Sequence, residues 1–119
     1  MKEIVFYKTI TDKNPVKDFL DSLSSKEAQK VVWVLKLIED LPQVPRQYFK
    51  KLANTDDIWE VRVNVEKKAF RILCFFDGIN LIVLAHAIQK KTQKTPRQAI
   101  RIAQARKKDY FQRRYGEYE

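Results

Sequence analysis

Two arginines of this sequence face one another across a predicted β-hairpin. Residues 59–65 alternate between apolar and polar side chains, and a two-residue turn at 66–67 returns the chain along residues 68–76. In that register Arg62 lies directly opposite Arg71, on the same face of the sheet. Adjacent guanidinium groups repel one another unless they share an anion, so the pair predicts an anion-binding site. Arg71 also interrupts a strand that is otherwise apolar on both faces, where an arginine needs a negative partner.

Glu60 and His86 bring groups that can exchange a proton to the same face. The dipeptide Asp77-Gly78 is a strong hairpin signal, and closure by a two-residue or four-residue loop places His86 on the face of Arg71. An odd-length loop or a bulge would change this assignment. The other end of this face is then predicted to be apolar and to consist of Leu73, Phe75, Ile82 and Leu84.

The positive charge of the chain is concentrated near its C-terminus. Residues 89–114 hold ten of the 24 lysines and arginines but only one of the 15 acidic residues, so they carry the whole net charge of +9. A neutral body with one basic segment indicates a polyanionic partner, most simply nucleic acid. A solvated helix face is the alternative explanation of such a charge run.

The length and composition predict a single domain, residues 1–119. They also favour a cytoplasmic location. A chain of 119 residues with 45% hydrophobic residues can bury its own core. No apolar run is long enough for a membrane span or a secretory segment, so we expect no membrane partner. The lone Cys74 fits a reducing compartment. No histidine, cysteine or carboxylate cluster has metal-ligand spacing, so we expect no metal and no cofactor.

The groups described above must be positioned by elements that the sequence marks clearly. Residues 3–8 are expected to form a strand, Asn14 to cap a helix, and Ser24 to open a second helix that ends before Pro42. The apolar stripes of the two helices are Val16, Phe19, Leu20 and Leu23, then Ala28, Val31, Leu35 and Ile38, joined by Val32 and Leu41. Residues 43–57 are expected to be mainly a loop.

The last element is predicted to be a basic helix. Thr95 is expected to cap it, Pro96 to occupy its first turn, and the helix to end near Arg114. Its apolar stripe is Ala99, Ile100, Ala103 and Tyr110. The predicted fold class is therefore α+β, in which an N-terminal strand and a helical hairpin pack on a compact, twisted antiparallel sheet that the C-terminal basic helix closes.

Several stretches occur in a fixed order along nearly the whole chain. They are NPVKDFLDSL (14–23), IWEVRV (58–63), FRILCFF (70–76), LIVLAHAIQKKTQKTP (81–96) and a closing helix with Ala103, Arg106, Asp109 and Tyr110. Together they resemble the RelE/ParE toxin superfamily, and most closely its HigB-like, phage-associated branch. The chain departs from the relatives at 56–57, where two aspartates replace a frequent glycine, and at 87–88, where Ala-Ile replaces Gly-Phe. The second change alters how closely a substrate can approach.

The resemblance implies a RelE-like fold and the toxin of a type II toxin–antitoxin system. Such a toxin is a ribosome-dependent, metal-independent endoribonuclease that cuts mRNA and inhibits translation. Its partners are the ribosome, the mRNA and a cognate antitoxin of the helix-turn-helix type. Cleavage of RNA through its own 2′-hydroxyl needs a base, a proton donor and cations around the phosphorane.

This chemistry suggests a role for each candidate residue. Arg62 and Arg71 are expected to clamp the phosphate, and Glu60 and His86 are the candidate acid and base, in either order. The candidates for transition-state charge or substrate-backbone binding are Lys90, Lys91 and Lys94. The candidates for binding RNA of the ribosome are Lys50, Lys51, Arg97, Arg101, Arg106 and Lys108.

Other interpretations of the same residues stay open. Glu60 is more simply the ion-pair partner of an arginine, and His86 can be a core histidine. ParE-like relatives share this fold but bind DNA gyrase, and a non-catalytic nucleic-acid-binding module needs only the basic helix. Tyr115 and Tyr118 can stack on a base or belong to a disordered tail.

Overall fold

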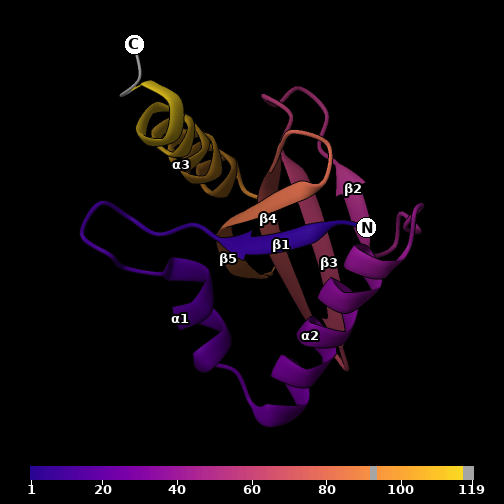
Figure 1. Ribbon diagram of the computed structural model, residues 1–119. Helices are drawn as coiled ribbons and strands as arrows, with labels where there is room; N and C mark the ends of the chain where they lie inside the picture. The colour runs from indigo at the N-terminus through magenta and orange to yellow at the C-terminus, as the bar shows by residue number, and fades with distance from the viewer. Residues whose placement is uncertain (92–93, 117–119) are drawn as a thin grey trace.

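A five-stranded sheet in the order β1-β5-β4-β3-β2 forms the centre of the protein (Figure 1). The computed structural model describes residues 1–91 and 94–116. The strands are β1 (Glu3–Phe6), β2 (Phe49–Lys51), β3 (Trp59–Val65), β4 (Lys68–Asp77) and β5 (Leu81–Lys90). The helices are α1 (Pro15–Asp21), α2 (Ser25–Asp40) and α3 (Arg97–Tyr115). The predicted α+β fold with a closing C-terminal helix is confirmed. β1 makes the sheet mixed, because it pairs in parallel with β5.

The helix starts follow the local signals of the sequence. The Asn14 side chain accepts a hydrogen bond from the Lys17 backbone at 3.2 Å, as a helix N-cap does. Ser24 and Glu27 form the predicted capping box, in which each side chain bonds the backbone of the other. Both predictions are confirmed. A cap can be predicted from the sequence because it depends on residues only three positions apart. β2 is the one strand, among the described residues, that lies inside the segment predicted to be mainly loop.

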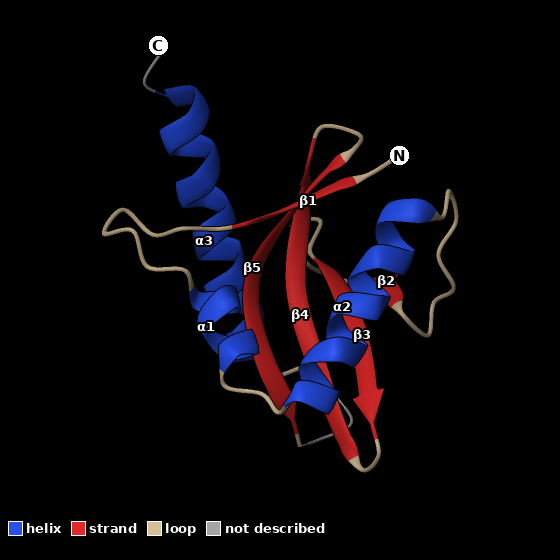
Figure 2. Cartoon of the chain, turned by 60° about the horizontal axis from the view of Figure 1, so that its bottom comes forward, coloured by secondary structure: helices blue, strands red, loops and turns tan. Residues whose placement is uncertain are grey.

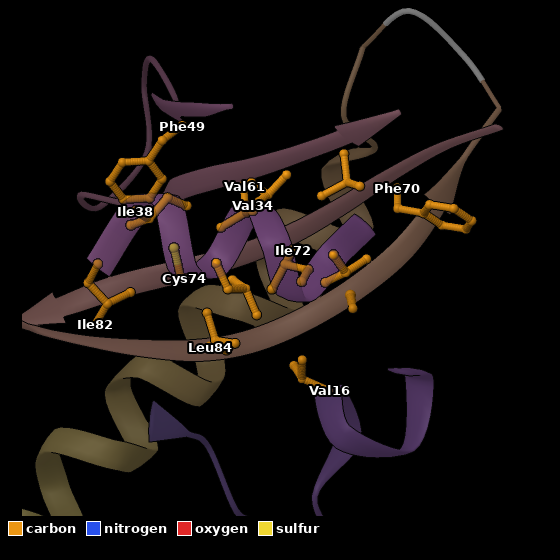
Figure 3. Packing of buried hydrophobic residues seen from close by; sticks show 14 of the residues in the cluster. Val16, Val34, Ile38, Phe49, Val61, Phe70, Ile72, Cys74, Ile82 and Leu84 are labelled. Atoms are coloured by element: carbon orange, nitrogen blue, oxygen red, sulfur yellow. The ribbon is translucent and has the colours of Figure 1, made fainter. Parts of the chain in front are cut away.

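Helices α1 and α2 cover one face of the sheet (Figures 2 and 3). Val16, Val34 and Ile38 point from the two helices into the same cluster as Phe70 and Ile72 of β4 (Figure 3). Val32 was predicted to join this stripe, but it is 58% exposed. The prediction was wrong because position 32 is turned by about 100° from position 31 on a helix, whereas Val34 lies on the buried side.

Helix α3 packs on the opposite face of the sheet. Ala99 and Ala103 are its buried residues, and they share a second cluster with Leu73 and Phe75 of β4. Their small side chains let the helix backbone approach the sheet closely. The ring of Phe75 also packs against Tyr110, with 5.4 Å between the ring centroids. This face therefore has an apolar part, which α3 covers, and a polar part beyond the start of the helix.

The β4–β5 hairpin contains two irregularities that together decide where His86 lies. Asp77 pairs with Leu81, so a three-residue loop closes the hairpin, with Gly78 at φ +78°. Further along, Cys74 pairs with Leu84 and Leu73 pairs with His86, which leaves Ala85 as an extra residue in a β-bulge. Each irregularity reverses the facing of β5 once.

The two reversals cancel for His86 but not for the residues between them. His86 lies on the face of Leu73, which is also that of Arg71, as predicted. Ile82 and Leu84, however, belong to the cluster under α1 and α2, and Val83 and Ala85 take the places beside Phe75. The prediction for Ile82 and Leu84 was therefore wrong.

No helix within residues 1–91 and 94–116 is both long enough and apolar enough to cross a lipid bilayer.

Candidate functional site

An open groove of about 230 Å³ lies on the α3 face, between the β2–β3 edge of the sheet and the start of α3. The strand register builds it, because Lys50 pairs with Glu60 and Arg62 pairs with Arg71, as predicted for the arginines. The described residues that line it are Lys50, Leu52, Ala53, Glu60, Arg62, Lys90, Lys94, Thr95 and Ile100. The groove thus joins four cationic side chains and one carboxylate from this described set.

Glu60 is the centre of the polar network in the groove. It is only 3% exposed, and its Oε1 lies 3.6 Å from Nε of Arg62 and 3.7 Å from Nε of Arg71. Its Oε2 accepts a hydrogen bond from the hydroxyl of Thr95. The interpretation of Glu60 as an ion-pair partner of the arginines is confirmed. A buried carboxylate with both oxygens engaged is poorly placed to take a proton from a substrate.

Arg71 lies beneath the groove and is 5% exposed. Its Nη1 donates to the carbonyl of Phe70 at 2.9 Å and to Oδ1 of Asn64 at 3.4 Å. Burial lowers the pKa of Arg71, and the charge of Glu60 acts in the opposite direction. The Nε atoms of Arg62 and Arg71 are buried and donate no hydrogen bond to any described residue. Buried donors without a hydrogen-bond partner are uncommon, and of the two arginines it is Arg62, 31% exposed at the side chain, that lines the groove where an anion can approach.

The lysines differ in how closely they approach this network. Burial lowers the pKa of Lys90, and the charge of Arg71 lowers it further. Lys91 and Lys94 are both exposed, and of the two only Lys94 lines the groove. Lys51 lies on the other face of β2 from Lys50 and pairs with Asp57 at 2.8 Å. Lys50, Lys90 and Lys94 therefore join the site, and Lys51 does not.

Thr95 was predicted to cap α3, and this prediction was wrong. Pro96 is the N-cap residue, and no side chain of a described residue makes a cap hydrogen bond. The hydroxyl of Thr95 bonds to Glu60 instead. A threonine hydroxyl satisfies a helix terminus or a distant carboxylate equally well, so the local pattern did not distinguish the two.

His86 does not line this groove. Its Nδ1 lies 3.1 Å from Nη1 of Arg106, which also donates to the carbonyl of Ala85 at 2.8 Å. An arginine nitrogen can only donate, so Nδ1 of His86 accepts and the ring proton is on Nε2. Arg106 therefore stabilises the backbone of the bulge and selects the tautomer of His86. The side chain of Arg106 is itself half-buried.

Helix α3 separates His86 from the groove. On one side of the helix, Lys107 donates to the carbonyl of Asp56, in the loop that precedes β3. On the other side, the guanidinium of Arg106 lies 5.9 Å from the ring centroid of Tyr7, which follows β1. Because β1 and β3 lie on opposite sides of β4 and β5 in the sheet, these contacts define two flanks of α3, and His86 is on the flank of β1.

His86 is expected to make the protein less stable in weak acid. Burial lowers its pKa, and the charge of Arg106 adds to this, so below pH about 6.5 the unfolded chain binds more protons than the folded one. The free energy of unfolding should therefore fall as the pH drops from 7.5 toward the lowered pKa. Above pH 7.5, His86 should make no contribution to the pH dependence of that free energy. Urea unfolding at several pH values, compared with His86→Gln, measures this. Equal pH dependence in both proteins would contradict the expectation.

The four bases of α3 that were predicted to bind RNA fall into two groups. Arg97, Arg101 and Lys108 are exposed along its outer side, whereas Arg106 is turned toward the sheet.

Tyr115 packs on Phe111, with 5.9 Å between the ring centroids, and its hydroxyl donates a hydrogen bond to Asp77 at 2.9 Å. Tyr118 lies outside the described residues.

Sequence analysis did not predict the contacts that two residues make in the site. Asn64 accepts from Arg71, and Thr95 donates to Glu60. Asn64 shares a face with Arg62, two residues away on β3, and that spacing was an available signal. The described residues contain no group of three histidines, cysteines or carboxylates placed to hold a metal ion.

Comparison with known protein families places most of the chain in one of them. Residues 18–108 match the model of a family described as Phage derived protein Gp49-like (DUF891). The match includes all residues that line the groove, as well as His86 and Arg106. None of the curated proteins matches the chain significantly.

Proposed function

Because the chain belongs to the phage-derived Gp49-like family, a family of RelE/HigB-type toxin-like proteins, we propose that it is the toxin of a type II toxin–antitoxin system. Within that group we place it in the HigB-like branch. Its proposed activity is cleavage of mRNA on the ribosome, which inhibits translation. Its proposed partners are the ribosome, the mRNA and a cognate antitoxin, and its proposed location is the cytoplasm.

The arginine pair is the observation that supports this proposal most. A buried cation and a partly exposed one lie side by side, and the Nε donors of both are unused by the described residues. Arg62, whose side chain is 31% exposed, contacts the scissile phosphate, and Arg71 stabilises the same charge from beneath the groove. Charge that develops on the phosphorane is stabilised strongly by cations already in place and shielded from water.

Proton transfer in the proposed reaction falls to Lys90 more readily than to Glu60. Lys90 lines the groove, and its pKa is lowered by burial and by Arg71, which makes a neutral amine easier to reach. Glu60 already uses both oxygens. A role for His86 as acid or base stays a prediction, and it requires the substrate to reach the other flank of α3.

Binding to the ribosome is assigned to the exposed bases around the groove. Lys91 and the bases on the outer side of α3 are exposed, and RNA phosphates are suitable ligands for exposed cations. The α3 bases that the proposal uses are Arg97, Arg101 and Lys108. Arg106 is not among them, because it is committed to His86 and to the bulge.

Primer extension on a reporter mRNA in a purified bacterial translation system tests the proposal. We expect new 5′ ends inside the reading frame that appear only when the toxin and ribosomes are both present. Folded protein that produces no such ends would contradict it. A gyrase supercoiling assay on the same preparation then tests the ParE-like alternative, and electrophoretic binding to RNA and DNA tests a non-catalytic module.

A further inference from the structure

The carboxylate of Glu60 is held in an unusual way. A carboxylate beside an arginine frequently accepts two parallel hydrogen bonds from the guanidinium. Here Oε1 faces the Nε atoms of both arginines at 3.6 and 3.7 Å, which is an ion-pair distance but too long for a hydrogen bond. The other oxygen, which a paired contact would use, is occupied by the hydroxyl of Thr95.

Thr95 makes this contact in place of a local one. It precedes the N-cap residue of α3, and the helix has no side-chain cap from any described residue. A threonine at a helix start often caps the helix and stabilises it. The hydroxyl of Thr95 instead binds a buried carboxylate 35 residues away, which indicates that the orientation of this carboxylate matters. The same residue connects the start of α3 to β3.

We propose that Thr95 is a positioning residue, which orients Glu60 so that its carboxylate balances the arginine pair without consuming their hydrogen-bond donors. The guanidinium of Arg62, whose side chain lines the groove and is 31% exposed, then stays available for a phosphate oxygen of RNA. The inference rests on the proposed function, because it assigns the groove to an RNA phosphate. Without the Thr95 hydroxyl, Oε2 is free to turn toward Arg62 and to form the paired contact that competes with the phosphate.

Thr95→Val removes the hydroxyl and keeps the shape of the side chain. We expect the single-turnover rate of mRNA cleavage on the ribosome to fall roughly tenfold to a hundredfold, because a small displacement of the clamp has effects of this size. Thr95→Ser should restore most of the rate. Thr11→Val, in an exposed loop outside the groove, is the matched control and should cleave like the wild type.

A double-mutant cycle separates positioning through Glu60 from a purely structural effect. If Thr95 acts through Glu60, Thr95→Val should have little further effect in a Glu60→Gln background, whereas independent effects would multiply. Circular dichroism and thermal unfolding establish that each variant is folded. An unchanged rate in Thr95→Val, or multiplying effects in the cycle, would overturn the proposal.

Binding of a 2′-O-methyl RNA oligonucleotide, which cannot be cut through its 2′-hydroxyl, gives a second readout. We expect fluorescence anisotropy to show weaker binding by Thr95→Val than by the wild type, and no such difference in the Glu60→Gln background. If the wild type binds in this way but cleaves no mRNA, the nuclease proposal fails and the role of Thr95 stands. If binding does not depend on Thr95, the role of Thr95 is refuted.

Discussion

Arg62→Ala is expected to lower the rate of mRNA cleavage by about a hundredfold to a thousandfold. This is the range found when one preorganised donor to a developing anion is removed. Arg62 is the better test of the arginine pair, because its side chain is 31% exposed and Arg71 remains to balance Glu60. Removing the buried Arg71 leaves Glu60 with one partner and endangers the fold. The measurement is single-turnover primer extension with saturating protein.

Arg46→Ala is the matched control, because Arg46 is exposed and precedes β2 outside the groove. It removes the same charge and should keep the wild-type rate. Thermal unfolding should show both variants folded. Cleavage by folded Arg62→Ala within a factor of about three of the wild type would remove the groove from the proposed mechanism, since an oxyanion donor contributes far more than that.

Phe75→Ala is expected to lower the free energy of unfolding by about 3–5 kcal/mol. Phe75 is fully buried, and its ring packs against Tyr110 and Phe111 at centroid distances of 5.4 and 5.6 Å. The substitution leaves a cavity between β4 and α3 that the rigid sheet cannot fill. Because α3 also forms one end of the groove through Ile100, cleavage should weaken together with stability. Urea unfolding monitored by circular dichroism measures the loss.

Phe76→Ala makes the same chemical change at the next residue, on the opposite face of β4. Phe76 is only half-buried, at the edge of the cluster that α1 and α2 cover. Phe76→Ala should therefore lower the free energy of unfolding clearly less than Phe75→Ala does, because it removes less buried apolar surface. An equal or larger loss in Phe76→Ala would show that the packing of α3 on Phe75 is not a main source of stability.

Sequence analysis predicted the features that depend on short-range signals. The caps at Asn14 and Ser24 need partners within three residues, and the turn at 66–67 fixes the register of β3 on β4. That register alone places Arg62 against Arg71. The arginine pair was therefore predictable, because a two-residue turn leaves no freedom in the pairing that follows it.

The features that sequence analysis missed depend on contacts between distant residues. The bulge at Ala85 has no glycine or proline to mark it, and its carbonyl is held by Arg106, 21 residues away. Without the bulge and the three-residue loop, the facing of Ile82 and Leu84 could not be predicted. The role of Thr95 depends on Glu60 in the same way, since a hydroxyl has no local preference between a helix end and a carboxylate.

The chemistry of the cut ends tests the central proposal most directly. Attack by the 2′-hydroxyl of the RNA releases a 5′-hydroxyl on one fragment and leaves a 2′,3′-cyclic phosphate or a 3′-phosphate on the other. We therefore expect mRNA fragments from ribosomes treated with the wild-type protein to accept a label from polynucleotide kinase without prior phosphatase treatment. New fragments that carry a 5′-phosphate would contradict the proposal, because they would require attack by water rather than by the RNA itself.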